Sequence, residues 1–193
     1  MNQSLHLSFK PVTPNNWEDL VTLFSSRGAP GDCWCMWFRL SRAQFARQRG
    51  EGNKQALQAI INSGEVPGIL AYDGDKPVGW CSVAPRSHFS SLERSRILKQ
   101  VDDKPVWSIV CFFIAKPYRR KGIMNFLLSS AITYATQNGA KIIEGYPLDP
   151  QNQKTPDANA YHGLKSSFLQ LGFQEVARRS ESRPIMRYSI KES

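Results

Sequence analysis

The stretch that most constrains the fold is residues 106–137, VWSIVCFFIAKPYRRKGIMNFLLSSAITYATQ. Its first part, residues 106–115, is a nearly unbroken apolar run rich in β-branched and aromatic residues, which indicates a strand buried on both faces. Its second part, residues 122–137, repeats apolar and small side chains at steps of three and four, which predicts an amphipathic helix. A buried strand that passes directly into a helix is therefore expected at the centre of the fold.

The connection between this strand and helix is a basic loop, KPYRRKG at residues 116–122. A helix N-terminus presents backbone N–H groups without partners and carries partial positive charge. Gly122 lets a ligand approach the backbone closely, and Arg119, Arg120 and Lys121 place three cations in a row. The loop therefore predicts a site for a phosphate or pyrophosphate; the alternative is a charged loop without a ligand.

Composition indicates one globular domain over residues 1–193, with 41% hydrophobic and 21% charged residues. No apolar run reaches the roughly 18 residues that span a bilayer, and the first residues, MNQSLHLSFKP, lack the pattern of a secretory signal. We therefore expect a cytoplasmic protein without a membrane partner. The four cysteines fit reduced thiols better than a disulfide framework.

The net charge is +9, from 25 Lys and Arg against 16 Asp and Glu, so the chain attracts anions. No long basic helix or basic–aromatic repeat supports nucleic acid as a partner, and we do not expect one. A small polyanionic ligand fits the same charge, whereas a strongly cationic substrate fits it poorly.

The remaining elements are predicted from hydrophobic periodicity and from glycine and proline positions. Residues 84–104 form an Arg-rich insertion, with a helix over 91–98. The expected strands are 5–10, 68–72, 77–83, 141–146, 173–178 and 185–190, and the expected helices are 13–26, 42–49, 54–63 and 158–171.

Arg119-x-x-Gly122-x-Met124, after a strand and a Pro-Tyr pair and at the start of a helix, resembles the acyl-CoA-binding motif of the GNAT N-acetyltransferase superfamily. That motif is usually written Gln/Arg-x-x-Gly-x-Gly/Ala, so Met124 is a departure, although phosphate binding needs only its backbone N–H. The sequence Leu171-Gly172-Phe173 is similar to the end of the family's last helix. The order of elements extends the resemblance over nearly the whole chain.

The resemblance implies an α/β (α+β) domain with a mixed, mostly antiparallel sheet of about seven strands and helices on both faces. It implies acetyl-CoA as co-substrate, no metal, and direct transfer of acetyl to an amine of a small-molecule acceptor. The phosphates would bind residues 119–124, including Ile123 and Met124. The central strand would diverge from its neighbour, so that a backbone N–H near Phe113 or Ile114 polarises the acetyl carbonyl.

The sequence offers more than one candidate for the general base. Many relatives carry a glutamate early on the central strand, where this chain has Ser108. Glu144, near the end of the next strand, is the leading candidate, because an apolar setting raises a carboxyl pKa towards neutrality; Asp149 is another. The alternatives are that Glu144 pairs with a cation, or that ordered water acts without a dedicated base.

The sequence also offers several candidates for the general acid. Relatives often carry a tyrosine where this chain has Phe168, which has no proton to give. Tyr161 lies seven residues earlier, about two helical turns, and could share the face of Phe168. A buried core tyrosine is the alternative interpretation of Tyr161, and Ser167 and His162 are further candidates.

The resemblance also implies that the segment between the first two helices covers the acceptor site, and this segment contains residues 33–38, Cys-Trp-Cys-Met-Trp-Phe. Trp34 and Trp37 could form an aromatic wall of the pocket, or could be core residues under a loop. A single Cys-x-Cys pair is too little for a zinc site. Arg86 or Arg94 of the insertion could bind an anionic group of the acceptor through its guanidinium, or could belong to a solvated basic face.

The sequence thus predicts an acetyl-CoA-dependent N-acetyltransferase acting on a small-molecule amine. Ser108 and Phe168, where relatives carry catalytic groups, favour the alternative of a non-catalytic acyl-CoA-binding or regulatory module with the same fold. A homodimer is one assembly that the sequence allows.

Overall fold

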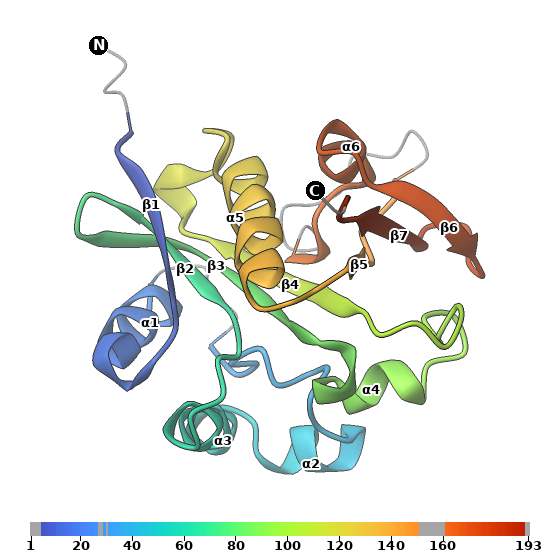
Figure 1. The fold of residues 1–193 in the computed structure, drawn as a ribbon. Coiled ribbons are helices and arrows are strands. Elements are labelled where there is room, and N and C mark those ends of the chain that lie inside the picture. Colours follow the sequence, from blue (N-terminus) through green and yellow to red (C-terminus); the bar gives the residue numbers. More distant parts are fainter. Residues whose placement is uncertain (1–4, 27–28, 30, 151–160, 192–193) are drawn as a thin grey trace.

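The buried strand predicted at residues 106–115 is β4 (Trp107–Ile114), the central strand of a seven-stranded sheet in the computed structural model. The structure describes residues 5–26, 29, 31–150 and 161–191. The strand order is β1-β2-β3-β4-β5-β7-β6, and every neighbouring pair is antiparallel except β4 and β5 (Figure 1). This confirms the predicted mixed, mostly antiparallel sheet.

The described elements follow the predicted order. The strands are β1 (Leu7–Pro11), β2 (Ile69–Asp73), β3 (Lys76–Pro85), β4 (Trp107–Ile114), β5 (Ile142–Gly145), β6 (Gln174–Arg178) and β7 (Pro184–Ser189). The α-helices are α1 (Trp17–Phe24), α2 (Arg42–Arg47), α3 (Glu51–Asn62), α4 (Ser90–Glu93), α5 (Ile123–Gln137) and α6 (Lys165–Gln170).

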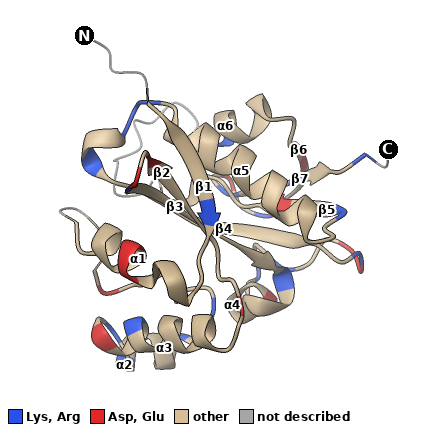
Figure 2. Cartoon of the chain, turned by 60° about the vertical axis from the view of Figure 1, so that its left-hand side comes forward, with Lys and Arg blue, Asp and Glu red and all other residues tan. Residues whose placement is uncertain are grey.

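Two apolar clusters cover the two faces of the sheet. Helices α1 and α3 and the segment after α1 pack on one face, against side chains such as Trp80 and Phe113. Helices α5 and α6 pack on the other face, against side chains such as Ile109 and Phe112 (Figure 1). Strand β4 carries no charged residue, and Figure 2 shows charged residues on helices such as α1 and α3 instead. The predicted apolar run is therefore buried on both faces.

Strand β4 contains a bulge and then diverges from β5. The register with β3 passes from Ser82↔Cys111 to Val83↔Ile109, so Val110 is the extra residue. Both Val110 and Cys111 consequently contact the cluster on the α1 face. The pairing of β4 with β5 includes only Trp107, Ser108 and Ile109. Beyond Ile109 the two parallel strands separate, which confirms the predicted divergence.

Two predicted helices are shorter than expected. The helix predicted at 158–171 is α6, which begins only at Lys165, because Gly163 has φ +75° and Leu164 is extended. Residues 158–160 of that prediction lie outside the described residues. In the insertion, the helix predicted at 91–98 is the single turn α4. None of the described helices combines the length and apolar character needed to cross a membrane.

Candidate active site

The phosphate-binding loop predicted after the central strand has an open backbone. A 3-10 turn at Lys116–Tyr118 follows β4, and Gly122 adopts φ +79° immediately before α5. A Cβ atom built on Gly122 would meet nothing within 4 Å, so a ligand can approach the backbone there. Arg119 Nε donates a 3.1 Å hydrogen bond to the Ile114 carbonyl, which ties the loop to the end of β4.

The other side chains of the loop leave this backbone accessible. Met124, the departure from the family motif, packs against the apolar cluster under α5. Its neighbour Ile123 is buried in the same cluster. Lys121 and Lys76 lie over the Tyr118 ring, with Nζ 5.5 and 5.7 Å from the ring centroid. The Met124 side chain therefore contacts the core, and the cations Lys76 and Lys121 lie beside the loop.

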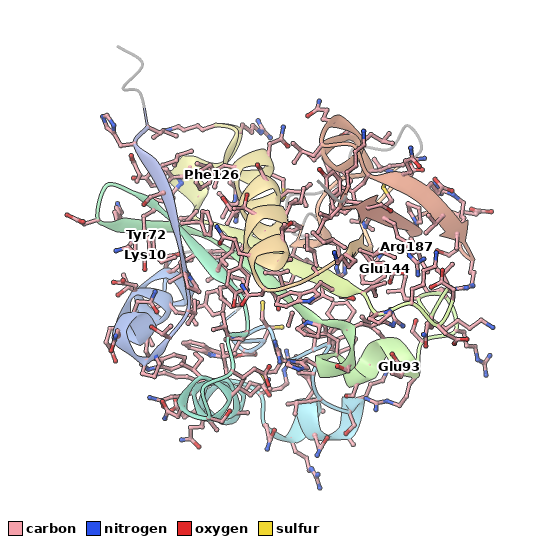
Figure 3. The ribbon with its side chains drawn as sticks, viewed as in Figure 1. Lys10, Tyr72, Glu93, Phe126, Glu144 and Arg187 are labelled. Atoms are coloured by element: carbon pink, nitrogen blue, oxygen red, sulfur yellow. The ribbon has the colours of Figure 1, made fainter. Side chains whose placement is uncertain are left out.

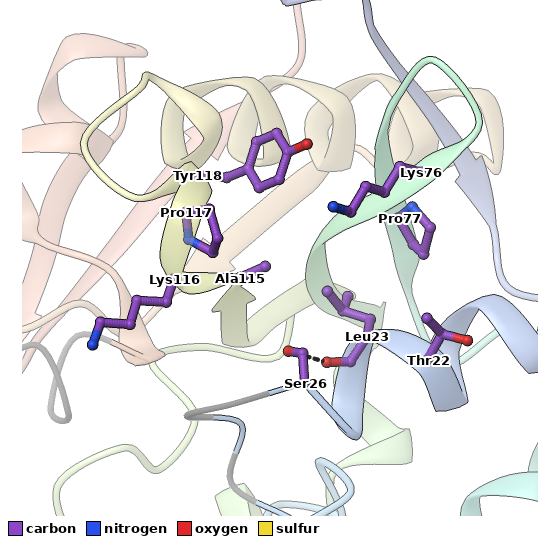
Figure 4. Close-up of a pocket in the computed structure, with 9 residues that line it drawn as sticks. All are labelled: Thr22, Leu23, Ser26, Lys76, Pro77, Ala115, Lys116, Pro117 and Tyr118. Atoms are coloured by element: carbon purple, nitrogen blue, oxygen red, sulfur yellow. Dashed lines mark hydrogen bonds between the residues drawn. The ribbon is translucent and has the colours of Figure 1, made fainter.

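A pocket of about 610 Å³ borders the same loop on the α1 side (Figure 4). Its lining is mostly apolar, with Lys76 and Lys116 as the charged members. Figure 4 shows the Lys76 side chain extending toward Tyr118, in agreement with their cation–π contact. The end of β4 is therefore flanked by a cavity and by cationic side chains.

Backbone directions on β4 distinguish the two amides predicted to face the thioester. The Ala115 N–H donates to the Val78 carbonyl of β3 at 3.0 Å. Amides of an antiparallel strand alternate in direction, and the register continues through Gly79↔Ile114 and Trp80↔Phe113. The Phe113 N–H is therefore directed to β3, whereas the Ile114 N–H faces the side on which β5 has diverged. Of the two, Ile114 has the orientation that the prediction requires.

Glu144 lies inside a buried network of charged and hydroxyl groups (Figure 3). Arg187 Nε donates to one carboxylate oxygen at 2.8 Å. The Tyr146 hydroxyl donates to the other oxygen at 2.8 Å, and Arg86 Nη1 lies 3.5 Å from it. Ser108, the strand neighbour of Glu144 in register, shares a 2.9 Å hydrogen bond with the Tyr146 hydroxyl.

These contacts support the alternative in which Glu144 is the partner of cations. The side chain is 1% exposed, and both its oxygens accept hydrogen bonds inside the fold. A covered carboxylate whose oxygens are both engaged inside the fold cannot contact a substrate amine directly. Burial, and then the nearby Glu144, raise the pKa of the Tyr146 hydroxyl, so this hydroxyl stays protonated.

Arg86 is a member of this network, which corrects its interpretation as part of a solvated face, while its contact with an acceptor stays a prediction. The side chain is buried, so it does not belong to a solvated face. Its Nε donates to Glu93, its Nη1 to Tyr146 and its Nη2 to the Leu98 carbonyl. Every nitrogen of the guanidinium therefore has an internal partner, and the side chain is held inside the fold.

The aromatic residues of segment 33–38 occupy three different environments. Trp34 is buried, with its ring centroid 5.4 Å from Phe24 and 5.9 Å from Trp17. Trp37 is 44% exposed and contacts Phe45 edge-to-face. Phe38 instead contacts His162, with ring centroids 5.7 Å apart. Trp34 therefore matches the core interpretation, and Phe38 lies nearer to the opening between β4 and β5.

The cysteines of this segment are free thiols next to β4. Cys35 Sγ lies 3.1 Å from Cys111 Sγ and accepts a hydrogen bond from Trp80 Nε1 at 3.0 Å. Burial, followed by the neighbouring Cys35, raises the pKa of the Cys33 thiol to about 11, so it is protonated and unreactive at neutral pH. Among the described residues, no group of three His, Cys, Asp or Glu side chains could hold a metal.

Tyr161 and His162 lie at the bulge rather than on a helix shared with Phe168. His162 Nδ1 is 3.1 Å from the Val110 carbonyl and therefore carries the proton that it donates. The Tyr161 ring is 4.1 Å from the His162 ring and is 45% exposed, so Tyr161 is not a buried core residue. The argument from a shared helical face is wrong, since Gly163 and Leu164 interrupt the helical conformation between Tyr161 and Lys165. Phe168 itself is fully buried.

His162 makes the stability of the fold depend on pH. Burial, and then the charge of Arg183, lower its pKa from 6.5 to about 3. Below pH 6.5, His162 binds a proton in the unfolded chain but not in the folded chain, so the stability falls as the pH drops from about 6.5 toward 3. We expect a loss of about 2 kcal/mol between pH 6.5 and 5.

Urea unfolding at a series of pH values measures this loss. In His162→Asn, which keeps an N–H donor but cannot titrate, the decline between pH 6.5 and 5 should largely disappear. An equal decline in the variant and the wild type would contradict the assignment to His162. Some carboxylates have lowered pKa values, such as Asp102 and Glu175 at about 2, and their protonation lowers the stability only below this pH range.

Sequence reasoning missed Arg183, which stands in the turn between β6 and β7. It influences the pKa values of both Tyr161 and His162 and therefore lies near them. The available signal was the Arg183-Pro184 pair, since a residue before proline is held extended. Its proximity to His162 depends on tertiary folding and has no local signature.

Comparisons with solved structures identify the fold. An acetyltransferase of the GNAT family from Streptococcus pneumoniae is 14% identical, with a TM-score of 0.57 over 96% of this chain and 100% of that one. The PaiA N-acetyltransferase from Thermoplasma acidophilum, solved with coenzyme A, is 15% identical, with a TM-score of 0.54 over 96% and 100%. An aminoglycoside N-acetyltransferase, also solved with CoA, is 13% identical, with a TM-score of 0.54 over 93% and 95%.

A comparison with curated protein sequences gives no match. The family model described as Acetyltransferase (GNAT) family matches residues 34–156, more than half of the chain. That range includes the central strand, the loop with Gly122 and helix α5. From this match, and from a sheet whose central parallel strands diverge beside an open helix N-terminus, the chain belongs to the GNAT acetyltransferase family.

Proposed function

We propose that this protein is an acetyl-CoA-dependent N-acetyltransferase that acetylates an amine of a small molecule. The observation that carries the proposal is the open backbone at Gly122, directly beside the divergence of β4 from β5. A helix N-terminus with cations around it suits a pyrophosphate, and the gap between the strands suits an extended arm. The four free cysteines suit a cytoplasmic setting.

In this proposal the loop binds the phosphates of acetyl-CoA, and β4 binds its acetyl group. The backbone of residues 119–124, with Arg119, Arg120 and Lys121, holds the phosphates of acetyl-CoA. The thioester of acetyl-CoA supplies the acetyl group, and the Ile114 N–H stabilises the negative charge that develops on the thioester carbonyl oxygen. The fit is supported by the space above Gly122 and by the packing of Met124 away from the loop.

Proton transfer is assigned to the groups near the bulge. Tyr161 is a candidate acid, because burial raises its pKa and keeps the phenol protonated at neutral pH. His162 keeps Nδ1–H on the Val110 carbonyl, which leaves the lone pair on Nε2. Glu144 stays the sequence-based candidate for the base, although its two arginine partners argue for a structural role.

Binding of acetyl-CoA is the first test. We expect the wild type to bind with micromolar affinity in a calorimetric titration, and the double variant Arg119→Ala, Arg120→Ala to bind at least about tenfold more weakly, since two charges next to the phosphates are lost. A matched control is Arg47→Ala, Arg49→Ala at the end of α2, which removes the same charge from exposed positions. Equal weakening in both variants would indicate general electrostatics rather than a phosphate site.

A non-catalytic acyl-CoA-binding module is the second candidate. It is favoured by the engagement of Glu144 and by the buried Phe168, where relatives carry a tyrosine. The discriminating measurement is CoA release with a broad panel of small amines. Binding of acetyl-CoA without transfer to any amine would favour the module, whereas transfer establishes the enzyme.

A further inference from the structure

Residues 161–165 lie between β4 and the chain that leaves β5, and we call this segment the wedge. The last residue of β5 that pairs with β4 is Gly145. Three residues further, Leu148 pairs with the wedge instead: its N–H donates to the Gly163 carbonyl, and its carbonyl accepts from the Lys165 N–H, both at 2.9 Å. After its last pair with β4, the chain that leaves β5 therefore bonds to the wedge.

The wedge reaches β4 through the side chain of His162, whose Nδ1–H donates to the Val110 carbonyl at 3.1 Å. The alternation that directs the Phe113 N–H to β3 continues to the pair Cys111↔Ser82, so the Cys111 N–H is also directed to β3. Across a trans peptide bond the Val110 carbonyl points opposite to the Cys111 N–H and faces the opening. His162 therefore fills a hydrogen-bonding position of β4 that β5 no longer fills.

Packing holds the His162 ring in this position. The side chain is 7% exposed and contacts the Phe38 ring edge-to-face, with centroids 5.7 Å apart. The Tyr161 ring lies 4.1 Å from it. The wedge backbone is also close to β4, because a Cβ atom on Gly163 would lie 3.2 Å from Phe112 Cε2. The bond from His162 to β4 is therefore part of a packed contact.

A second side chain bonds to β4 at the other end of the opening. The Ile114 carbonyl faces the opening, because the Ala115 N–H across the same peptide bond is directed to β3. This carbonyl accepts from Arg119 Nε at 3.1 Å. Between the bonds from His162 and Arg119 lie Phe112 and the Ile114 N–H, which face the opening. The two side chains thus bracket the backbone groups that β4 presents to a ligand.

We propose that His162 is a positioning residue of the acetyl-transfer site: its bond to Val110 holds the bulge of β4 and thereby sets the direction of the Ile114 N–H. The inference rests on the proposed function and deepens it. A bulge bends a strand and changes its twist, and beyond Ile109 β5 no longer supports this edge of β4. Without His162 the Val110 carbonyl loses its partner, and the strand beyond the bulge can turn.

The thioester carbonyl of bound acetyl-CoA reports the direction of the Ile114 N–H. Infrared difference spectra with acetyl-CoA that is isotope-labelled at the acetyl carbonyl carbon isolate this band, and a hydrogen bond lowers its frequency. We expect the band to lie lower on the wild type than in free acetyl-CoA. His162→Phe, which keeps a ring but has no donor, should return the band to the free position. The affinity for acetyl-CoA should fall by less than about tenfold, the range for one neutral hydrogen bond.

His162→Asn is the matched variant, because it has no ring but keeps an N–H donor, and it should retain most of the frequency shift. His6→Ala, which removes an exposed histidine side chain, is the control and should behave as the wild type. A wild-type shift in His162→Phe together with its loss in His162→Asn would mean that the ring only fills space, and it overturns the proposal.

The wild type alone also tests the inference, whichever variants fold. An unshifted band on a wild type that binds acetyl-CoA overturns the role of His162, because no polarising N–H is then positioned. Failure of the wild type to bind acetyl-CoA, measured in the same samples, would instead reject the proposed function.

Discussion

Gly145→Ala is expected to lower the free energy of unfolding by about 3 kcal/mol, equivalent to roughly 6–12 °C in melting temperature for a chain of this size. Gly145 lies on β5, paired with Ile109 and Met186. A Cβ atom there would come within 2.0 Å of Phe168 Cε1, far inside contact distance. The added methyl group can be accommodated only if the Phe168 ring or the strand moves.

The Phe168 ring has little room to move. It is fully buried between Phe112 and Phe173, with centroid distances of 6.3 and 4.9 Å. A Cβ atom on Gly163 would also lie 2.9 Å from this ring, so the backbone approaches it from a second side. Displacement of β5 is then the remaining response, and it would disturb the strand next to the β4 opening.

Thermal and urea unfolding of three variants check this prediction. Gly31→Ala is the control, since a Cβ atom there meets nothing within 4 Å, and it should change stability by less than about 0.5 kcal/mol. Phe168→Leu should restore part of the stability of Gly145→Ala, because the two changes relieve the same overlap. Wild-type stability of Gly145→Ala alone would show that the space around Phe168 is larger than the structure indicates.

The central elements could be predicted from the sequence because their signals are local. The apolar run at residues 106–115 becomes β4, and Gly122 ends the loop before α5 at the expected place. The order and mixed direction of the sheet followed from the family resemblance. The bulge at Val110 had no such signal, since the apolar run continues through it without a glycine or proline.

The burial and the partners of charged side chains could not be predicted, because they depend on contacts between residues that are distant in the sequence. Arg86 lies in a segment that reads as a basic surface, yet its partners are Glu144 and Tyr146 on and after β5. Arg183 reads as an ordinary turn residue, yet its donors are buried without partners in the described structure. The sequence showed where cations are abundant, but not which of them the fold uses internally.

Glu144→Gln is expected to lower the free energy of unfolding by about 3–5 kcal/mol, the range for breaking a buried ion pair by removing one partner. The amide can accept on one side only, so either Arg187 or Tyr146 would face its NH2 group. Arg187 keeps its bidentate contact with Asp102, at 2.6 and 2.9 Å. The loss should therefore lie nearer the lower end of the range.

The control is Glu175→Gln on β6, which also removes a carboxylate paired with two cations, Arg178 and Lys165. Glu175 lies at the surface, so its replacement should cost about 1 kcal/mol or less. Unfolding measurements on both variants separate the buried network from an ordinary surface pair. Equal small effects would mean that the network around Glu144 contributes little to stability.

The same variant decides whether Glu144 is the general base. If its role is structural, Glu144→Gln loses stability, while the folded fraction keeps the wild-type dependence of acetyl transfer on pH. If Glu144 is the base, the rate falls by about 10²–10⁴-fold and the limb of the pH profile that reports the base disappears. Because Arg187 and Arg86 both compensate its charge inside the fold, we expect the first outcome, which would leave ordered water to accept the proton.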